Sequence, residues 1–138
     1  MNSKILIIGA CGQIGTELTH KLRKIYGADN VIASDIRKLN IDVVNSGIFE
    51  VVNALDFNQI EHLVEQYQIT DIYLMAALLS ATAEKNPAFA WDLNMNSLFH
   101  VLNLAKAKKI KKIFWPSSIA VFGPTTPREN TPQYTVME

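Results

Sequence analysis

The sequence predicts an α/β fold built on a doubly wound parallel sheet. An apolar run at residues 4–8 leads directly into an evenly spaced glycine triplet, and an amphipathic segment follows. The triplet consists of Gly9, Gly12 and Gly15. A second apolar run, residues 31–34, ends at Asp35. Strand patterns then keep alternating with helical patterns, which is typical of parallel strands joined by right-handed helical crossovers.

The first strand–helix–strand unit occupies the N-terminal quarter of the chain. Residues 4–8 are almost uniformly apolar, as expected of a strand that is buried on both faces. Residues 13–26 repeat apolar side chains at helical spacing, and Gly27 ends this helix. The face that we expect to be buried carries Ile14, Leu18, Leu22 and Ile25. Residues 31–34 form the second strand.

The next segment connects two further strands through a capped helix. Residues 36–48 show no periodicity and predict an irregular connection, and residues 49–52 predict a short strand. Asp56 or Asn58 caps the helix that follows, because either side chain can accept from a free backbone N–H. The apolar face of that helix carries Ile60, Leu63, Val64 and Tyr67.

The last predicted elements are a strand, a long helix and a final strand. Residues 71–75 form the strand, and the helix opens with Asn86 at its cap and Pro87 at its first position. Its apolar stripe consists of Ala90, Leu93, Leu98, Val101, Leu102 and Ala105. Residues 111–115 form the fifth strand. The two tryptophans are expected to be packing residues: Trp91 and Trp115.

The chain is predicted to contain one domain and a tail. Residues 1–123 form the domain, and residues 124–138 form a proline-rich segment that neither a helix nor a central strand would tolerate. The first strand starts almost at once, so we expect no signal peptide. A single cysteine excludes an internal disulfide and fits a reducing compartment, so we expect a cytoplasmic location.

The charge balance and the histidines exclude several function classes. Thirteen Lys and Arg residues balance thirteen Asp and Glu residues, so no bulk charge draws the chain to nucleic acid or to a membrane. A lysine-rich run at residues 106–112 follows a helix, and we interpret it as a solvated face. His20, His62 and His100 fall on separate helices without metal-ligand spacing, so no metal is predicted.

The glycine triplet predicts a Rossmann-type site for a dinucleotide. Gly9 permits the tight turn, Gly12 lets the backbone approach a pyrophosphate, and Gly15 lets the helix pack close to the sheet. The N–H groups of Gln13 and Ile14 lie at the positive end of this helix, where they suit phosphate oxygens.

The acidic residue at the end of the second strand predicts the cofactor. The Asp35 carboxylate can accept hydrogen bonds from both hydroxyls of the adenosine ribose and would repel a 2′-phosphate, so the sequence favours NAD over NADP. Arg37 leaves an alternative open, since its guanidinium could pair with a 2′-phosphate or lie against the adenine.

Other candidate residues follow the third, fourth and fifth strands. Asp56 can accept from the adenine amine and Phe57 can supply an apolar wall, although Asp56 is nearly as well explained as a plain helix cap. Small side chains after the fourth strand would let a cofactor ribose lie on the backbone of Ala76, Ala77 and Leu78. Ser80, in an expected loop over residues 80–84, and the serine pair Ser117 and Ser118 lie at the same carboxyl edge of the sheet.

These motifs together resemble the extended short-chain dehydrogenase/reductase family. The matching pieces are Asp35, Asp56 and residues 9–15, 94–97 and 116–123. Within the family the chain is most similar to the short-chain type of L-threonine 3-dehydrogenase, through residues 32–37, 75–84 and 115–127. The resemblance implies NAD as cofactor, L-threonine as small-molecule substrate and a homodimer.

The resemblance also implies roles for individual residues. Ser118 takes the position of the catalytic hydroxyl and would hold the substrate oxygen, while Ser80 matches a serine that contacts threonine. Asn94 matches an asparagine that supports the active site, and Asn94 and Ile36 join the cofactor-binding set. The family abstracts the proton with a tyrosine that is followed four residues later by lysine, but here Tyr134 is followed by Glu138.

The chain therefore resembles the N-terminal, cofactor-binding part of such an enzyme, without the C-terminal substrate domain. By this resemblance the parent protein oxidises the secondary alcohol of L-threonine to 2-amino-3-oxobutyrate, and the 138 residues alone are expected to be inactive. Two alternatives remain open: a nucleotide-sugar epimerase of the same family, and a non-catalytic NAD-binding module.

Overall fold

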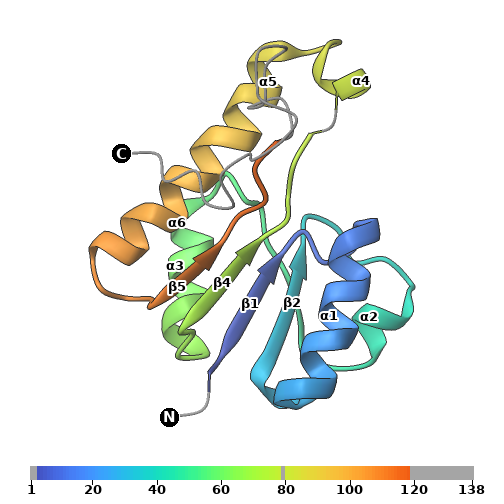
Figure 1. Ribbon diagram of the computed structural model, residues 1–138, viewed down its shortest axis with the longest axis vertical. Coiled ribbons are helices and arrows are strands. Elements are labelled where there is room, and N and C mark those ends of the chain that lie inside the picture. The colour runs from blue at the N-terminus through green and yellow to red at the C-terminus, as the bar shows by residue number, and fades with distance from the viewer. Residues whose placement is uncertain (1–2, 79, 119–138) are drawn as a thin grey trace, which may run out of the picture.

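The computed structural model describes residues 3–78 and 80–118, and it contains one parallel sheet of five strands (Figure 1). The strands are β1 (Ile5–Ile8), β2 (Val31–Asp35), β3 (Phe49–Val51), β4 (Asp71–Leu74) and β5 (Lys112–Phe114). Each strand end lies within one residue of its predicted position. The spatial order is β3-β2-β1-β4-β5, so the chain moves outward from β1 to β3 and then outward again from β4 to β5. This confirms the doubly wound fold.

Helices cover both faces of the sheet. They are α1 (Gln13–Tyr26), η1 (Ala28–Asn30), α2 (Asp42–Asn45), α3 (Phe57–Gln66), α4 (Ser80–Ala83), α5 (Pro87–Trp91), η2 (Asp92–Asn96) and α6 (Ser97–Lys106). Helices α1 and α2 lie on one face, and α3 and α6 lie on the other (Figure 1). Among residues 3–78 and 80–118, none of the helices combines the length and apolar character needed to cross a bilayer.

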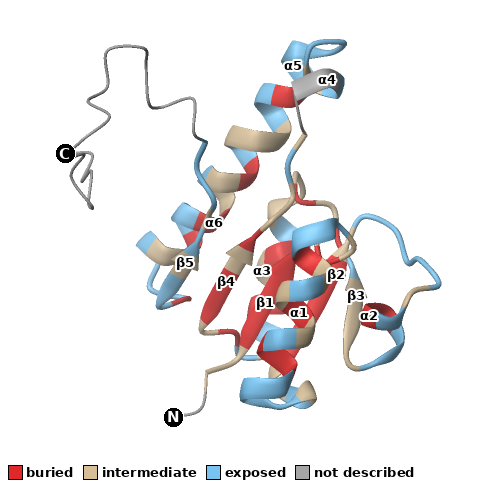
Figure 2. Cartoon of the chain, turned by 45° about the vertical axis from the view of Figure 1, so that its right-hand side comes forward, coloured by how far each residue is buried: buried red, intermediate tan, exposed pale blue. Residues whose placement is uncertain are grey.

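The central strands supply the core on both faces of the sheet. Successive side chains of a strand point to opposite faces. In β1, Leu6 and Ile8 therefore pack toward α3 and α6, whereas Ile5 and Ile7 pack toward α1 and α2. All four are at most 1% exposed. Figure 2 shows this buried centre and the exposed region around α5.

The predicted buried face of α1 is wrong at two of its four positions. Ile14 is 68% exposed and Ile25 is 58% exposed. The buried residues of α1 are Gly15, Thr19, Leu22 and Arg23. Gly15 sets this face, because its close contact with the glycine loop rotates the helix so that positions one and two turns later also face the sheet.

The long helix after Asn86 has a break that the sequence pattern did not predict. The cap itself is confirmed, since the Asn86 side chain accepts from Phe89 N. The π-helical segment η2 then separates α5 from α6. A π segment widens the turn and shifts the register of everything after it. Leu102, predicted to be buried, is 43% exposed, and Leu104 is buried instead, because Leu104 lies closer to the face of Ala90 and Val101 at 3.6 residues per turn.

Three smaller expectations are also corrected. The connection at 36–48 contains the short helix α2, and the expected loop at 80–84 contains α4. Trp91 is 64% exposed, so it is not a packing residue, whereas Trp115 does pack against the core. The lysines of the run at 106–112 are exposed, as predicted, and Lys109 Nζ binds Glu61 and Glu65 at 2.8 and 2.6 Å.

Candidate functional site

A cleft of about 480 Å³ lies at the carboxyl edge of the sheet. Its walls come from the loop after β1, the end of β2 with the residues that follow, the segment after β3 and the segment after β4. The strand order reverses between β1 and β4: β2 and β3 are added on one side of β1, and β4 and β5 on the other. Ligands of doubly wound folds bind at such switch points. The volume falls within the range of small-molecule sites.

The glycine loop closes the floor of this cleft. Gly9 has a φ of +94°, and a Cβ on it would lie 2.5 Å from the backbone nitrogen of Ala76. A Cβ on Gly15 would lie 2.2 Å from the carbonyl oxygen of Gly9. Both contacts are impossible for a side chain, so the glycine loop approaches the segment after β4 at Gly9, and α1 approaches the loop at Gly15, more closely than any other residue would permit.

Gly12 differs from the other two glycines because space remains around it. A Cβ there would meet only the Gly9 carbonyl oxygen, at an ordinary 3.6 Å. Gly12 lines the cleft and precedes α1, and it has no side chain with which to cap that helix. The N–H groups of Gln13 and Ile14 belong to the first helical turn, whose N–H groups carry the positive end of the helix dipole. This arrangement fits the pyrophosphate of a dinucleotide.

The Asp35 carboxylate is fixed by two backbone donors at the edge of the cleft. Cys11 N donates to Oδ2 at 2.9 Å, and Ile36 N donates to Oδ1 at 2.8 Å. A carboxylate oxygen can accept two hydrogen bonds, so both oxygens retain capacity for ribose hydroxyls. Arg37 is exposed and lines the same cleft.

Cys11 is positioned by the loop rather than activated by it. Burial and the nearby charge of Asp35 both raise the pKa of the Cys11 thiol. A thiol with a raised pKa carries less of the reactive thiolate at neutral pH. The chemistry of the thiol thus favours the interpretation of Cys11 as a small loop side chain.

The opposite wall is held in place by Asn94. Its Oδ1 accepts from Leu78 N at 2.8 Å, and its Nδ2 donates to the Leu78 carbonyl oxygen at 3.2 Å. Asn94 lies in the π segment η2, so the irregular helix presents its side chain to the loop after β4. Ala76 and Ala77 line the cleft within the same loop.

Six of the predicted cofactor-binding residues do not line the cleft: Gln13, Ile14, Gly15, Asp56, Phe57 and Asn94. Asp56 and Phe57 make other contacts. Asp56 Oδ1 accepts from Gln59 N at 3.1 Å, which makes this residue the cap of α3. The ring of Phe57 packs edge-on against His100, with 5.7 Å between the ring centroids. Their assignment to the adenine stays a prediction.

The predicted substrate side of the site is described only in part. Ser117 and Ser118 are exposed and follow β5 at the carboxyl edge. Ser80 begins α4, but its side chain lies outside the described residues, as do residue 79 and the tail from residue 119 onward, including Tyr134.

Several cleft residues escaped prediction. Asn53 and Leu55 directly follow β3, so their place after a strand was an available signal. Phe89 and Leu93 come from α5 and η2, and nothing in the local sequence marks them as cleft residues.

Comparison with known proteins gives the same family by several routes. Residues 5–137 match the family model described as the NAD dependent epimerase/dehydratase family. An uncharacterized epimerase/dehydratase of Staphylococcus saprophyticus is 52% identical over 134 residues, which are 96% of this chain and 42% of that protein.

Solved structures of L-threonine dehydrogenases are also similar. A partial consensus L-threonine 3-dehydrogenase is 57% identical with a TM-score of 0.86, over 98% of this chain and 43% of that one. The holo form of an L-threonine dehydrogenase from Cupriavidus necator is 52% identical with a TM-score of 0.85, with the same shares covered. That of Clostridium difficile is 48% identical with a TM-score of 0.88, over 99% and 43%. The chain spans about two fifths of the length of these relatives.

Proposed function

Because the chain belongs to the NAD dependent epimerase/dehydratase family, we propose that it is the cofactor-binding part of an NAD-dependent L-threonine 3-dehydrogenase. The assignment of NAD as cofactor rests on the Asp35 carboxylate, which is hydrogen-bonded to the glycine loop at the edge of the cleft. The substrate is supported by the similarity of the chain to proteins described as L-threonine dehydrogenases.

The residues present fit the adenosine and pyrophosphate half of NAD. Gly12 leaves room beside the start of α1, and the N–H groups of Gln13 and Ile14 suit phosphate oxygens. Asp35 would accept the ribose hydroxyls, with Ile36 and Arg37 beside it. The backbone of Ala76, Ala77 and Leu78, held by Asn94, would form the opposite wall.

The chemical step would be the oxidation of the secondary alcohol of L-threonine to 2-amino-3-oxobutyrate. When bound, NAD supplies the hydride acceptor. Ser118 would donate a hydrogen bond to the substrate oxygen, and Ser80 would contact the amino acid. Proton abstraction in the family belongs to a tyrosine with a lysine four residues later, a motif that the 138 residues do not contain.

The domain boundaries and the setting of the enzyme belong to the same proposal. Residues 1–123 would form the NAD-binding domain, and residues 124–138 would lead toward the remainder of the enzyme. The full-length protein would be a cytoplasmic homodimer that binds neither nucleic acid nor a membrane.

The test is a spectroscopic assay of the full-length protein with NAD and L-threonine. We expect reduced nicotinamide to accumulate with L-threonine, and much less with NADP in place of NAD. A nucleotide-sugar epimerase is the second candidate, since curated relatives carry the description epimerase/dehydratase. Isomerisation of a nucleotide sugar without threonine oxidation would replace the first candidate by the second. NAD binding without either reaction would indicate a non-catalytic module.

A further inference from the structure

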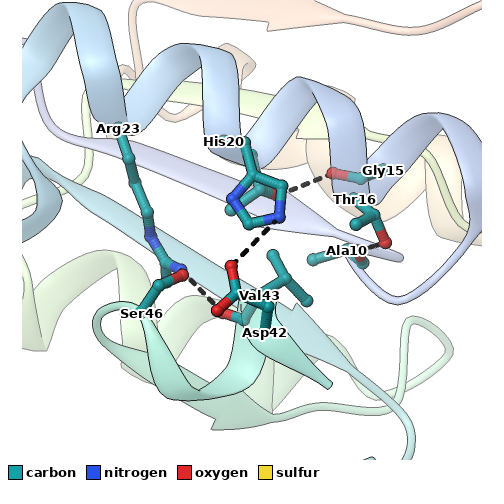
Figure 3. Close-up of polar contacts among 9 residues, drawn as sticks. Ala10, Gly15, Thr16, His20, Arg23, Asp42, Val43 and Ser46 are labelled. Carbon is teal, nitrogen blue, oxygen red and sulfur yellow. Dashed lines mark hydrogen bonds and ion pairs between the residues drawn. The ribbon is translucent and has the colours of Figure 1, made fainter.

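The guanidinium of a buried arginine on α1 donates hydrogen bonds to the connection between β2 and β3. Arg23 is only 7% exposed. Its Nη1 donates to the Val43 carbonyl oxygen at 2.6 Å and to Ser46 Oγ at 2.9 Å, and its Nη2 donates to the Ile48 carbonyl oxygen at 2.7 Å. We call these four residues the Arg23 clasp (Figure 3 shows Arg23, Val43 and Ser46).

Stability alone is a weak reason to bury this charge. Burial lowers the pKa of the Arg23 guanidinium, although the charge of Asp42 opposes the shift. The guanidinium nitrogen Nε is buried, and no hydrogen-bond partner for it is found among the described residues. Buried charges of this kind contribute little net stability, but they can fix one arrangement of the segments they join. Here the joined segments are α1 and residues 43–48.

The clasp lies between two stretches of the cleft wall. Before it, residues 36, 37 and 39 line the cleft. After it, the Ile48 carbonyl oxygen also accepts from Ala33 N at 3.1 Å, which starts the pairing of β3 with β2. Residues 52–55 follow β3 directly and line the cleft as well. Holding residues 43–48 therefore constrains the wall on both sides.

The same helix also carries the glycine loop. Thr16 Oγ1 donates to the Ala10 carbonyl oxygen at 3.2 Å, one turn into α1 (Figure 3). Farther along α1, His20 Nε2 lies 3.5 Å from Asp42 Oδ2, at the start of α2 (Figure 3). Helix α1 thus links the loop that would hold the pyrophosphate to the segment that would hold the adenosine.

We infer that Arg23 is a positioning residue for cofactor recognition: it fixes residues 43–48 to α1 and thereby sets where the preceding wall residues, Arg37 among them, stand relative to the glycine loop and Asp35. The inference rests on the proposed NAD site. Without the clasp, the wall samples open arrangements, and the affinity for NAD falls in proportion to the fraction of time that the wall still spends in the closed, binding-competent arrangement. Arg37, released with the segment, can then reach a 2′-phosphate, so NADP loses less affinity than NAD.

The first test compares Arg23→Leu with Lys24→Leu in the full-length protein. The control removes a positive charge from the next, exposed position of the same helix. For Arg23→Leu we expect faster hydrogen exchange across residues 36–48. Calorimetry should show NAD binding weakened by about tenfold and a smaller NADP-to-NAD ratio of dissociation constants. A lower melting temperature with unchanged exchange in this segment and an unchanged ratio would overturn the inference.

A second variant disturbs the clasp from the other side. A Cβ on Gly47 would lie 2.7 Å from Arg23 Nε and 2.8 Å from Arg23 Cζ, so Gly47→Ala should displace the guanidinium. This variant should reproduce the change in selectivity even if Arg23→Leu fails to fold. In the Arg23→Leu background, Gly47→Ala should cause no further change in selectivity, because the guanidinium that the new Cβ would contact is absent.

The two proposals fail in different ways. A wild-type protein that binds neither dinucleotide would overturn the proposed function. A wild-type protein that prefers NAD, with the same preference in Gly47→Ala and Arg23→Leu, would overturn only the role of the clasp.

Discussion

One of the two backbone N–H groups that fix the Asp35 carboxylate comes from the glycine loop. The donor is the amide of Cys11, a residue of the glycine loop, and the bond spans 24 positions of sequence. The residue that would read the ribose is thereby joined to the loop that would hold the phosphates. The identity of residue 11 matters less than its backbone, which explains how a cysteine with a raised pKa can occupy this position.

Replacing Asp35 should reduce the preference for NAD over NADP. We expect a preference on the order of 1–3 kcal/mol in the wild type, the scale for an unfavourably paired polar group. Asp35→Ala should narrow it, because the carboxylate no longer repels a 2′-phosphate. Calorimetric titration with both cofactors measures the difference. Asp29→Ala, which removes an exposed carboxylate from η1, should leave it unchanged.

Ser118 should be the more important residue of the serine pair. In the full-length enzyme, Ser118→Ala should lower kcat/KM by an amount that corresponds to about 1.4–4 kcal/mol of transition-state stabilisation, the range for losing one positioned donor near developing charge. Affinity for NAD should hardly change, and Ser117→Ala should be much milder. Steady-state kinetics of both variants checks this. Normal turnover by Ser118→Ala with loss of turnover by Ser117→Ala would mean that the register is wrong by one residue.

At the scale of an element, the π segment η2 shows how an irregular helix serves a site. Asn94 lies in η2, and its side-chain amide bonds to both backbone groups of Leu78. π segments are frequent at functional sites.

Asn94→Ala should loosen the loop after β4. Two hydrogen bonds to Leu78 are lost, and we expect the free energy of unfolding to fall by about 1–3 kcal/mol. Chemical denaturation measures this change. Asn96→Ala is the matched control: Asn96 lies in the same segment but is exposed, and its amide bonds only to Asp92 among the contacts described. A loss of similar size in both variants would contradict the special role of Asn94.

The elements differ in how far the sequence predicts them. Strand positions follow from continuous apolar runs, and the glycine triplet follows from steric requirements that only glycine meets, so both were predictable. The buried face of α1 was not, because the close contact of Gly15 outweighs the hydrophobic periodicity. The clasp of Arg23 was not either, since a buried arginine looks in sequence like any solvated helix charge.

At the scale of the whole molecule, the residues proposed to bind the cofactor lie in this chain, whereas the family's proton-abstracting motif does not. The 138 residues carry Asp35, the glycine loop and Ser118, but they contain no tyrosine followed four residues later by lysine. The candidate site was predictable where it depends on local motifs, and it was not where distant segments meet, as at Phe89 and Leu93.

The 138-residue chain should show no threonine dehydrogenase activity, whereas the full-length parent should. Loss of acid–base catalysis alone lowers rates by about 10²–10⁴-fold. The check is an assay of the purified chain, with its mass verified, beside the full-length protein at equal concentration. Robust turnover by the 138 residues would show that another group accepts the proton.

The strand order also dictates a sequence of events during folding. Strands β1, β2 and β3 pair with neighbours close in sequence, but the other edge of β1 pairs with β4, so Ile5 must find Asp71 across 66 positions. Closing so long a loop slows folding. A nascent chain that has emerged only as far as α3 therefore presents the bare edge of its most apolar strand, the kind of surface that invites aggregation. Strand β1, the central strand of the complete sheet, is thus an edge strand open to aggregation until β4 pairs with it.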